Sequence, residues 1–440
     1  MRNDMKPAKN WLCRVVLVVL HSSFLVLGVP ATAQVAGNNA VYNSNGLVQP
    51  STAFIDASKV SQGSDICATI HNILTSQTFV SGTVVDARGI ISANPMVCAT
   101  SPWSGSVRSP STVLLPAGTI VIPSTLILPS NTKLIGLGYG TTGGTVIQAC
   151  TTSNCSANFP TGTPMIQTGL GSCSPGVFCD TGVSVENLML DGFSLNINGI
   201  QNGTAQSSHV DHVTMYRILG TGLVVSSQNS GPYTNITFDS GPSALSTTTC
   251  ANITGPNGLG IHGLTCIVIT AANAAVYLDS SSNSIEDVRI AGFLDGVLVG
   301  SQGAAQSNVL FNIFGDTIIS TNTPSPVNVI HLSTLHTVTD ISIMGVNNVG
   351  GGSNNTIRDD LTSTTLTDPY VAMYVLGKSA NGGYSRFTTS PHAATWGSGA
   401  STPSGACGAS SAGSLYSNTS GTGAALWVCP VGGGSWAAIR

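Results

Sequence analysis

The sequence predicts an all-β protein: a single-stranded right-handed parallel β-helix (a solenoid) with an N-terminal capping helix and a small C-terminal β module. Three observations predict this fold. Of the 440 residues, 42% are hydrophobic and only 7% are charged, whereas about 25% are charged in ordinary soluble domains. Short apolar segments recur every 21 to 32 residues through the middle of the chain. Inside each segment the apolar residues stand two apart, which is the period of a strand and not of a helix.

The composition also excludes several classes of protein. Long surface helices and coiled coils need Glu, Lys and Arg on their solvent-exposed faces, so the low charge excludes them. Intrinsic disorder needs high charge with low hydrophobicity, so the composition excludes it as well. With 14 Lys and Arg against 18 Asp and Glu, the chain has no basic excess to neutralise a nucleic acid. A large core under a surface rich in Ser, Thr, Asn and Gly is typical of a secreted all-β protein.

Residues 1–33 have the order of a signal peptide. Lys6, Lys9 and Arg14 precede an apolar stretch over 15–29, and the small residues 31–33 (Ala-Thr-Ala) form a cleavage site. A membrane anchor is the alternative, but this stretch is short for a span that needs about 20 residues. We therefore expect a secreted protein, extracellular or at the cell surface, without membrane association once the signal is removed.

The cysteines agree with export. Beyond Cys13 ten remain, in neighbouring pairs: Cys67/Cys98, Cys150/Cys155, Cys173/Cys179, Cys250/Cys266 and Cys407/Cys429. An even, locally clustered set in an exported chain predicts disulfides. Zinc is the alternative, but the closest pair, Cys150 and Cys155, has no second close pair or His pair beside it. We expect no metal site.

Residues 34–110 are predicted to cap the solenoid. Ser64 or Asp65 precedes a helical pattern that places Ile66, Ile70, Ile73 and Leu74 on one face. A strand follows at 84–88. An amphipathic helix here would cover the core and the unpaired edge that the end of a solenoid exposes.

Residues 111–390 are predicted to form the β-helix. Seven segments share an Asn, Asp, His or Gly followed by two apolar residues at spacing two, beginning at Asn187, His212, Asn235, Gly263, Asp287, Asn308 and Asp340. Further β-prone runs lie between them, at 223–225, 276–278, 297–299, 329–332 and 371–375. Asn and Asp tolerate the left-handed conformation that a tight corner needs. A sandwich or propeller is the alternative, which frequent hairpin turns of the Asn-Gly or Asp-Gly type would favour.

The run 114–149, LLPAGTIVIPSTLILPSNTKLIGLGYGTTGGTVIQA, resembles the opening coils of the pectate-lyase superfamily, and most of all its rhamnogalacturonase/epimerase-like group. The resemblance covers roughly residues 54–376. It implies a right-handed β-helix whose members include polysaccharide-cleaving enzymes and phage or surface adhesins. The usual acidic opening of the group, Gly-Asp-Gly-x-x-Asp-Asp, is replaced by Phe54-Ile55-Asp56-Ala57-Ser58.

Alternation within the strands leads to a candidate site. If Leu188/Leu190, Val213/Met215 and Ile236/Phe238 point inward, then the next residues, Asp191, Tyr216 and Asp239, share an outer face on three successive coils. Coils stack about 4.8 Å apart, so the two aspartates would lie roughly 9–10 Å apart, at the upper edge of the separation in inverting glycosidases.

These residues divide into two proposed roles. The candidate catalytic residues are Asp191, Asp239 and Arg217, and the candidate substrate-binding residues are Tyr216, His212, Asp211 and His209. The alternative is that both aspartates are ordinary turn residues that end strands.

Residues 391–440 are predicted to form a separate module with a Cys407–Cys429 staple. Strands are expected at 413–419, 425–429 and 435–439, and they carry Tyr416, Trp427 and Trp436. The simpler interpretation is that these aromatic side chains make up the only core so small a module can have. The alternative is that they bind sugar.

Two classes of function remain open at this stage. One is an enzyme acting on an extracellular polysaccharide, a lyase or a glycoside hydrolase in the manner of pectate lyases and polygalacturonases. The other is a non-catalytic surface adhesin or fibre-like structural protein. Both imply a polysaccharide or cell-surface glycan as partner. No cofactor is evident, calcium has no supporting motif, and the oligomeric state cannot be read from the sequence.

Overall fold

The computed structural model describes one solenoid and one small C-terminal sheet. It covers residues 54–300, strand segments at 41–42, 48–49 and between 310 and 399, and parts of 400–439. Gaps within the first range lie at 61–63, 77–78, 80, 91–94, 106–109, 141–142, 151–158, 170–179, 204, 228, 256–259 and 279–282. The predicted signal peptide and the strand expected at 371–375 lie outside the described residues.

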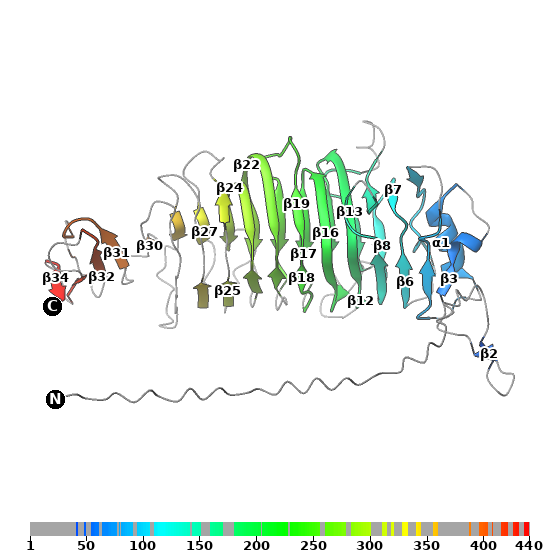
Figure 1. The fold of residues 1–440 in the computed structure, drawn as a ribbon, viewed down its shortest axis with the longest axis horizontal. Helices are drawn as coiled ribbons and strands as arrows, with labels where there is room; N and C mark the ends of the chain where they lie inside the picture. Colours follow the sequence, from blue (N-terminus) through cyan, green and yellow to red (C-terminus); the bar gives the residue numbers. More distant parts are fainter. Residues whose placement is uncertain are drawn as a thin grey trace, which may run out of the picture. The chain divides into compact units, whose positions relative to one another are not determined.

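The solenoid is a right-handed parallel β-helix, as the sequence predicts (Figure 1). Its strands stack into three parallel faces. The first face consists of β3 (Phe54–Asp56), β4 (Val84–Asp86), β6 (Ser111–Leu114), β9 (Thr132–Ile135), the start of β13 (Ser184–Leu195) and of β16 (His209–Ile218), β18 (Tyr233–Thr234), β21 (Ile261–His262), β23 (Asn283–Glu286), β25 (Leu310–Phe314) and β28 (Asp340–Met344).

The other two faces follow each coil around the axis. The second face consists of β5 (Met96–Val97), β7 (Gly118–Val121), β10 (Thr145–Gln148), the later parts of β13 and β16, β19 (Thr237–Asp239), the start of β22 (Thr265–Leu278) and of β24 (Arg289–Val299), and β26 (Ile318–Ser320). The third consists of β8 (Leu126–Leu128), β11 (Pro164–Thr168), β14 (Asn198–Asn202), β17 (Thr221–Val225), β20 (Thr249–Ile253), the ends of β22 and β24, β27 (Asn328–Leu332), β29 (Asn355–Asp359) and β30 (Phe387–Thr388).

Short pairs accompany these faces. The strands β12 (Asp180–Thr181) and β15 (Ala205–Gln206) pair in parallel, and β1 (Val41–Tyr42) and β2 (Val48–Gln49) pair antiparallel.

The inward positions stack as the sequence predicts. On the second face one inward position of each coil stands in register with the next, and its side chain is fully buried. These residues are Leu190, Met215, Phe238, Cys266 and Ile290. Because alternate side chains of a strand point to opposite faces, the neighbouring positions of these strands point to the outside. The core is filled by stacked side chains, so a ligand of any size must bind outside the coils.

The predicted alignment of the repeat holds for five of its seven segments and is wrong for the last two. The segments that begin at Asn308 and Asp340 belong to the first face, because Leu310 pairs with Asp340 and Ile313 with Ile285. The second face continues instead at Ile318, opposite Arg289. Apolar residues at spacing two occur on all three faces, so this pattern alone does not tell which face a segment joins.

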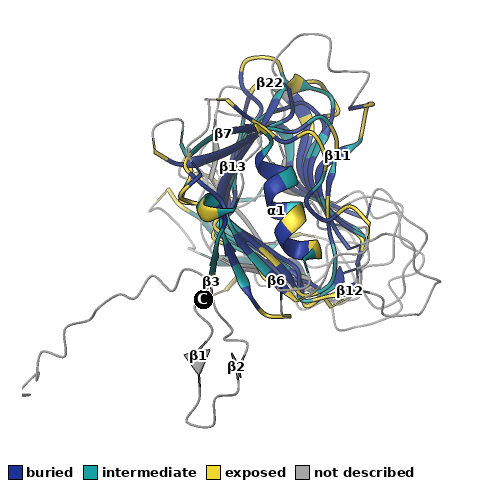
Figure 2. Ribbon diagram, turned by 90° about the vertical axis from the view of Figure 1, so that its right-hand side faces the viewer, coloured by how far each residue is buried: buried dark blue, intermediate teal, exposed yellow. Residues whose placement is uncertain are grey.

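The helix α1 (Ile66–Thr75) lies across the end of the coils, as predicted (Figure 2). Its N-cap is Asp65, whose carboxylate accepts the N–H groups of Cys67 (2.9 Å), Ala68 (3.1 Å) and Ala99 (3.1 Å). Its inner face buries Ile66, Cys67, Thr69, Ile70, Ile73 and Leu74. The Asp56 carboxylate similarly caps the short 3-10 helix η1 (Ala57–Lys59) through the N–H of Ser58. The acidic residues near the N-terminal cap therefore support backbone turns.

Three of the predicted disulfides are present: Cys67–Cys98, Cys250–Cys266 and Cys407–Cys429. The first joins α1 to the coil beside β5. Cys150 is also disulfide-bonded, while Cys155, Cys173 and Cys179 lie outside the described residues.

The C-terminal sheet contains β31 (Trp396–Gly399), β32 (Leu415–Asn418), β33 (Leu426–Val428) and β34 (Ala437–Ile439). The last three strands pair antiparallel, and β31 pairs in parallel with β32. Among the described residues of this sheet and its loops, the buried ones are Cys407 and Cys429, whereas Tyr416, Trp427 and Trp436 stay partly exposed. The three aromatic side chains are thus only partly buried, and the disulfide is the buried element of the described part of the sheet.

Candidate functional site

Asp191, Tyr216 and Asp239 stand in one register on β13, β16 and β19. We call them the tyrosine row. The residues just before them are buried inside the coils, so the structure brings the three together on the outer side of the second face. At a strand spacing of about 4.8 Å the two aspartates lie roughly 9–10 Å apart along the axis. Thr214 and Thr237, two positions earlier on the same strands, lie beside this row.

Asp191 is clamped by Arg217 of the next coil. The Arg217 Nε donates to Asp191 Oδ1 at 2.9 Å, and its second nitrogen donates to Oδ2, which makes a two-pronged pair. The N–H of Phe193 also donates to Oδ1, at 3.0 Å. Asp191 is only 6% exposed, and its hydrogen bond raises the pKa of the Arg217 guanidinium further above its usual value. The pair is thus a fixed structural element at one end of the row.

The Arg217 guanidinium also contacts the aromatic rings of Phe193 and Tyr216. The Arg217 Cζ lies 5.2 Å from the centre of the Phe193 ring and 5.3 Å from that of Tyr216, within range of a cation–π interaction. A Cβ added at Gly241 would lie 3.2 Å from Arg217 Cγ and 4.0 Å from the Tyr216 ring, so this backbone also packs against the pair. Tyr216 is therefore held in place while part of its ring stays exposed.

The backbone beside this clamp is strained. Phe193, Ser194 and Arg217 adopt left-handed φ values of 53°, 60° and 51°, which cost free energy for residues other than glycine. Conformations of this kind persist only where the surroundings enforce them, and they cluster at functional sites. Three residues with such a backbone conformation lie around Tyr216, which makes this part of the second face a candidate functional site.

Asp239 differs from Asp191. It is partly exposed, and its Oδ1 accepts the N–H of Gly241 at 2.8 Å. Both oxygens of Asp191 are engaged by Arg217, whereas no contact with a cation is recorded for Asp239 among the described residues. Of the two carboxylates, Asp239 is the one that a ligand on Tyr216 can reach.

A corner separates the second face from the first. All of its residues have left-handed φ values, from 52° to 71°. They stand at equivalent positions of five coils: Asn187, His212, Asn235, Gly263 and Asp287. We call them the corner row. This confirms the conformation that the sequence predicts for its Asn and Asp corners. His212 projects outward here, with 51% of its side chain exposed.

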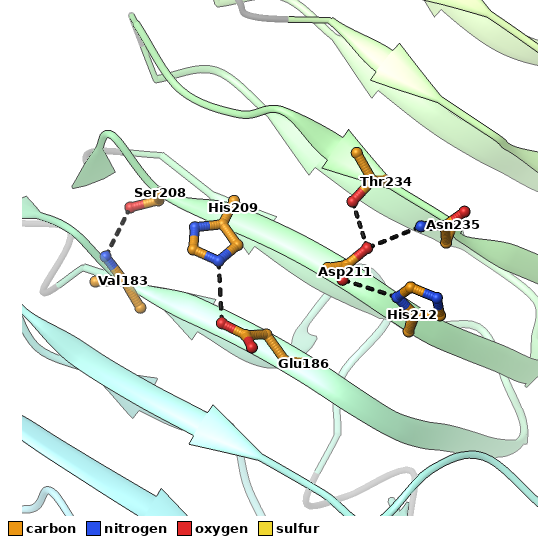
Figure 3. A network of polar contacts seen from close by, with 8 residues as sticks. All are labelled: Val183, Glu186, Ser208, His209, Asp211, His212, Thr234 and Asn235. Carbon is orange, nitrogen blue, oxygen red and sulfur yellow. Dashed lines mark hydrogen bonds and ion pairs between the residues drawn. The ribbon is translucent and has the colours of Figure 1, made fainter. Parts of the chain in front are cut away.

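Across the corner lies a second polar row: Glu186, Asp211, Thr234, His262 and Glu286 stand in one register on five successive strands of the first face. We call it the acid–histidine row. Glu186 pairs with Nε2 of His209 at 3.0 Å, Asp211 with Nδ1 of His212 at 2.7 Å, and Glu286 with Nδ1 of His262 at 2.9 Å. Figure 3 shows the part of this network around Glu186 and Asp211.

Asp211 is the most densely bonded member of this row. Burial raises the pKa of its carboxyl group, but hydrogen bonds from Thr234, His212 and Asn235 outweigh that effect, so its pKa lies below the usual value. Asn235 donates at 3.1 Å, and the Thr234 hydroxyl also donates. The carboxylate therefore stays ionised and positioned at neutral pH.

The structure thus divides the predicted site residues between two faces. Asp191, Tyr216, Arg217 and Asp239 lie on the second face, His212 lies at the corner, and His209 and Asp211 lie on the first face. Sequence reasoning missed Glu186, Thr234, His262 and Glu286. A signal for them existed, because each comes immediately before a corner residue of the aligned segments.

The family described as "Rhamnogalacturonase A/epimerase, pectate lyase-like" matches residues 62–298, more than half of the chain. The chain belongs to this family. The match spans α1, the tyrosine row and the acid–histidine row, so both candidate rows fall within the part of the chain that defines a pectate-lyase-like protein. No curated protein matches the chain.

Several solved structures are similar to this pectate-lyase-like chain. The ORF18 protein of Geobacillus virus E2 is 13% identical, with 76% of this chain and 62% of that chain covered and a TM-score of 0.44. This chain therefore spans about three fifths of the viral protein. The A-module of mannuronan C-5 epimerase AlgE6 from Azotobacter vinelandii is 15% identical, with 74% and 93% covered and a TM-score of 0.33. DFA-IIIase from Arthrobacter chlorophenolicus A6 without its lid is 11% identical, with 74% and 98% covered and a TM-score of 0.27.

Across the described residues, no three His, Cys, Asp or Glu side chains gather as they would around a metal ion. Nor does any described helix have the length and apolar character needed to cross a membrane.

Proposed function

We propose that this pectate-lyase-like chain is exported and binds a polysaccharide or cell-surface glycan along the outer side of the coils from β13 to β24. The observation that carries the proposal is the accessible and fixed ring of Tyr216. Tyr216 is partly exposed, is fixed by Arg217 and Gly241, and stands in a strained stretch of backbone. A sugar ring binds well to an aromatic face that loses little freedom on binding.

The two polar rows suit a polymeric ligand. Carboxylates, imidazoles and hydroxyls of the acid–histidine row and the tyrosine row can accept from and donate to sugar hydroxyls. They recur at each coil, about 4.8 Å apart, so an extended chain lying along the axis meets similar groups at every step. Export is supported by the disulfides, which form in oxidising compartments.

Cleavage of the bound glycan is the second candidate function. Asp191 stands two coil steps from Asp239, but both of its oxygens are engaged by Arg217, so it does not supply the second carboxylate of an inverting pair. In this proposal Asp239 beside Tyr216 is the reacting carboxylate, and Asp191 with Arg217 positions the ring. The alternative is an adhesin that binds on the same face without chemistry.

A tyrosine substitution tests glycan binding. Tyr216→Ala removes the stacking surface, so affinity for a bound polysaccharide should fall about tenfold or more, which is ~1.4 kcal/mol or above. Tyr216→Phe keeps the ring and should bind within about twofold of the wild type. The measurement is isothermal titration over a glycan panel, beside a melting curve. Equal binding by Tyr216→Ala and wild type would refute the proposal.

Asp239→Asn separates binding from cleavage. If the protein cleaves, this change should abolish the release of reducing ends, or of unsaturated products seen by ultraviolet absorbance, while binding persists. If the wild type binds but releases neither product, the protein is a binding protein and the catalytic candidate fails.

A further inference from the structure

The C-terminal sheet carries three aromatic side chains on one side. Tyr416 and Trp427 are directly opposite each other on β32 and β33, so they project from the same side of the sheet. The ring of Trp436, just before β34, lies 6.0 Å from that of Tyr416 at an angle of 58°. The positions flanking the pair in register are Gly397 and Ala438, which are too small to cover the rings.

This aromatic surface remains partly accessible. All three residues are partly exposed, while the buried residues of the described part of this sheet and its loops are Cys407 and Cys429 of the disulfide. Large aromatic side chains that remain accessible on one side of a small stapled sheet are typical of a binding surface.

The charge of this region restricts what can bind. Between Arg386 and Arg440 the chain contains no Asp, Glu, Lys or Arg. The strands instead offer Ser and Asn, including Ser417 and Asn418 on β32. Among the described residues of this sheet and its loops an anionic or cationic ligand finds no opposite charge, whereas a neutral sugar needs only aromatic faces and hydroxyl or amide partners.

We propose that Tyr416, Trp427 and Trp436 form a second binding site, specific for uncharged glycans and separate from the tyrosine row of the β-helix. The two sites differ in chemistry, because the rows on the β-helix contain carboxylates and histidines, whereas the described residues of this surface include no ionisable group except the tyrosine hydroxyl. Binding at the C-terminal sheet should therefore be nearly independent of salt.

The test uses the full-length chain in a Tyr216→Ala background, which disables the site of the proposed function. The probes are cellohexaose, xylohexaose and mannohexaose as neutral glycans and hexagalacturonic acid as the charged one, measured by titration calorimetry and tryptophan fluorescence. We expect at least one neutral probe to bind better than the charged one. Its affinity should change less than about twofold between about 50 and about 500 mM NaCl.

Trp427→Ala should then lower that affinity at least about tenfold. The matched control is Leu426→Ala, which removes an apolar side chain from the neighbouring position on the other side of the same strand and should leave binding unchanged. Light scattering of each variant reports the oligomeric state. The proposal is overturned if no neutral probe binds to the Tyr216→Ala protein, or if adding Trp427→Ala leaves the affinity of that protein unchanged. It is also overturned if Trp427→Ala changes the molecular mass of the particle in solution, which would make the surface a contact between copies of the chain.

The two proposals fail separately. Binding that survives Tyr216→Ala but is lost on adding Trp427→Ala supports this site and not the first one. Binding that is lost with Tyr216→Ala alone supports the first site and overturns this one.

Discussion

At the scale of single residues, the site depends on one ion pair in which Asp191 is buried and Arg217 is partly exposed. Asp191 is almost fully covered, and its carboxylate is matched by the two-pronged Arg217 guanidinium and one backbone N–H. Such a pair adds little net stability compared with apolar residues of the same shape, but removal of one partner leaves a buried charge without compensation. Arg217 thus connects the stability of the coil to the position of Tyr216.

The stability loss on removing Arg217 can be compared with the loss on removing an arginine from an exposed ion pair. Arg217→Met should lower the free energy of unfolding by about 1–3 kcal/mol, because Asp191 then stays buried with only the Phe193 N–H as a partner. Its control is Arg88→Met, which removes the arginine of the exposed Asp86–Arg88 pair (2.8 Å) and should cost no more than about 1 kcal/mol. Urea unfolding of both variants measures the difference. Equal losses for the two variants would show that the Asp191 pair is not buried in solution.

At the scale of elements, the coils turn by left-handed corners. Asn187, His212, Asn235 and Asp287 adopt the conformation that glycine takes freely at Gly263. A short polar side chain tolerates this geometry, whereas a β-branched side chain does not. The corner row therefore sets the angle between the tyrosine row and the acid–histidine row.

A substitution at one corner tests this role. Asn187→Val should destabilise the protein by about 1–2 kcal/mol, because its φ of 55° brings the branched Cβ against the backbone. Asn187→Gly relieves that contact and should stay close to the wild type. Lys133→Val, at an exposed strand position of β9 on the first face, introduces the same β-branching at an ordinary φ; it is the control and should be nearly neutral. Thermal melting ranks the three variants, and a stable Asn187→Val would contradict the corner assignment.

Much of this arrangement follows from local patterns, and some of it does not. The period-two alternation places Leu190, Met215 and Phe238 inside and their neighbours outside, as the structure confirms. The burial of Asp191 could not be predicted the same way, because it results from the path of the long Arg217 side chain from another coil. Glu186 and His262 were not predicted, because the apolar pairs that reveal the register come after each corner residue and these two side chains come before it.

At the scale of the whole molecule, the solenoid is a stack in which each coil contacts its neighbours. The described faces pair strand to strand in parallel from β3 onward, and α1 covers the first coils (Figure 2). In such a structure stability is close to a sum of coil and interface contributions. A defect inside one coil should therefore act most strongly on the coils next to it.

Val288→Asp tests this property. Val288 is 1% exposed and follows the corner residue Asp287, so an aspartate there would be an unpaired buried charge that costs several kcal/mol. Hydrogen exchange should show lost protection in β22 and β24, with the loss decreasing toward α1 and β4. Thr265→Asp is the control, because Thr265 lies on the outer side opposite Arg289 in register, where a new carboxylate meets solvent and a cation. Two outcomes of Val288→Asp would contradict this expectation. A uniform loss of protection from α1 to β24 would mean that these coils unfold as one cooperative unit. Unchanged protection would mean that the side chain at position 288 does not point into the core.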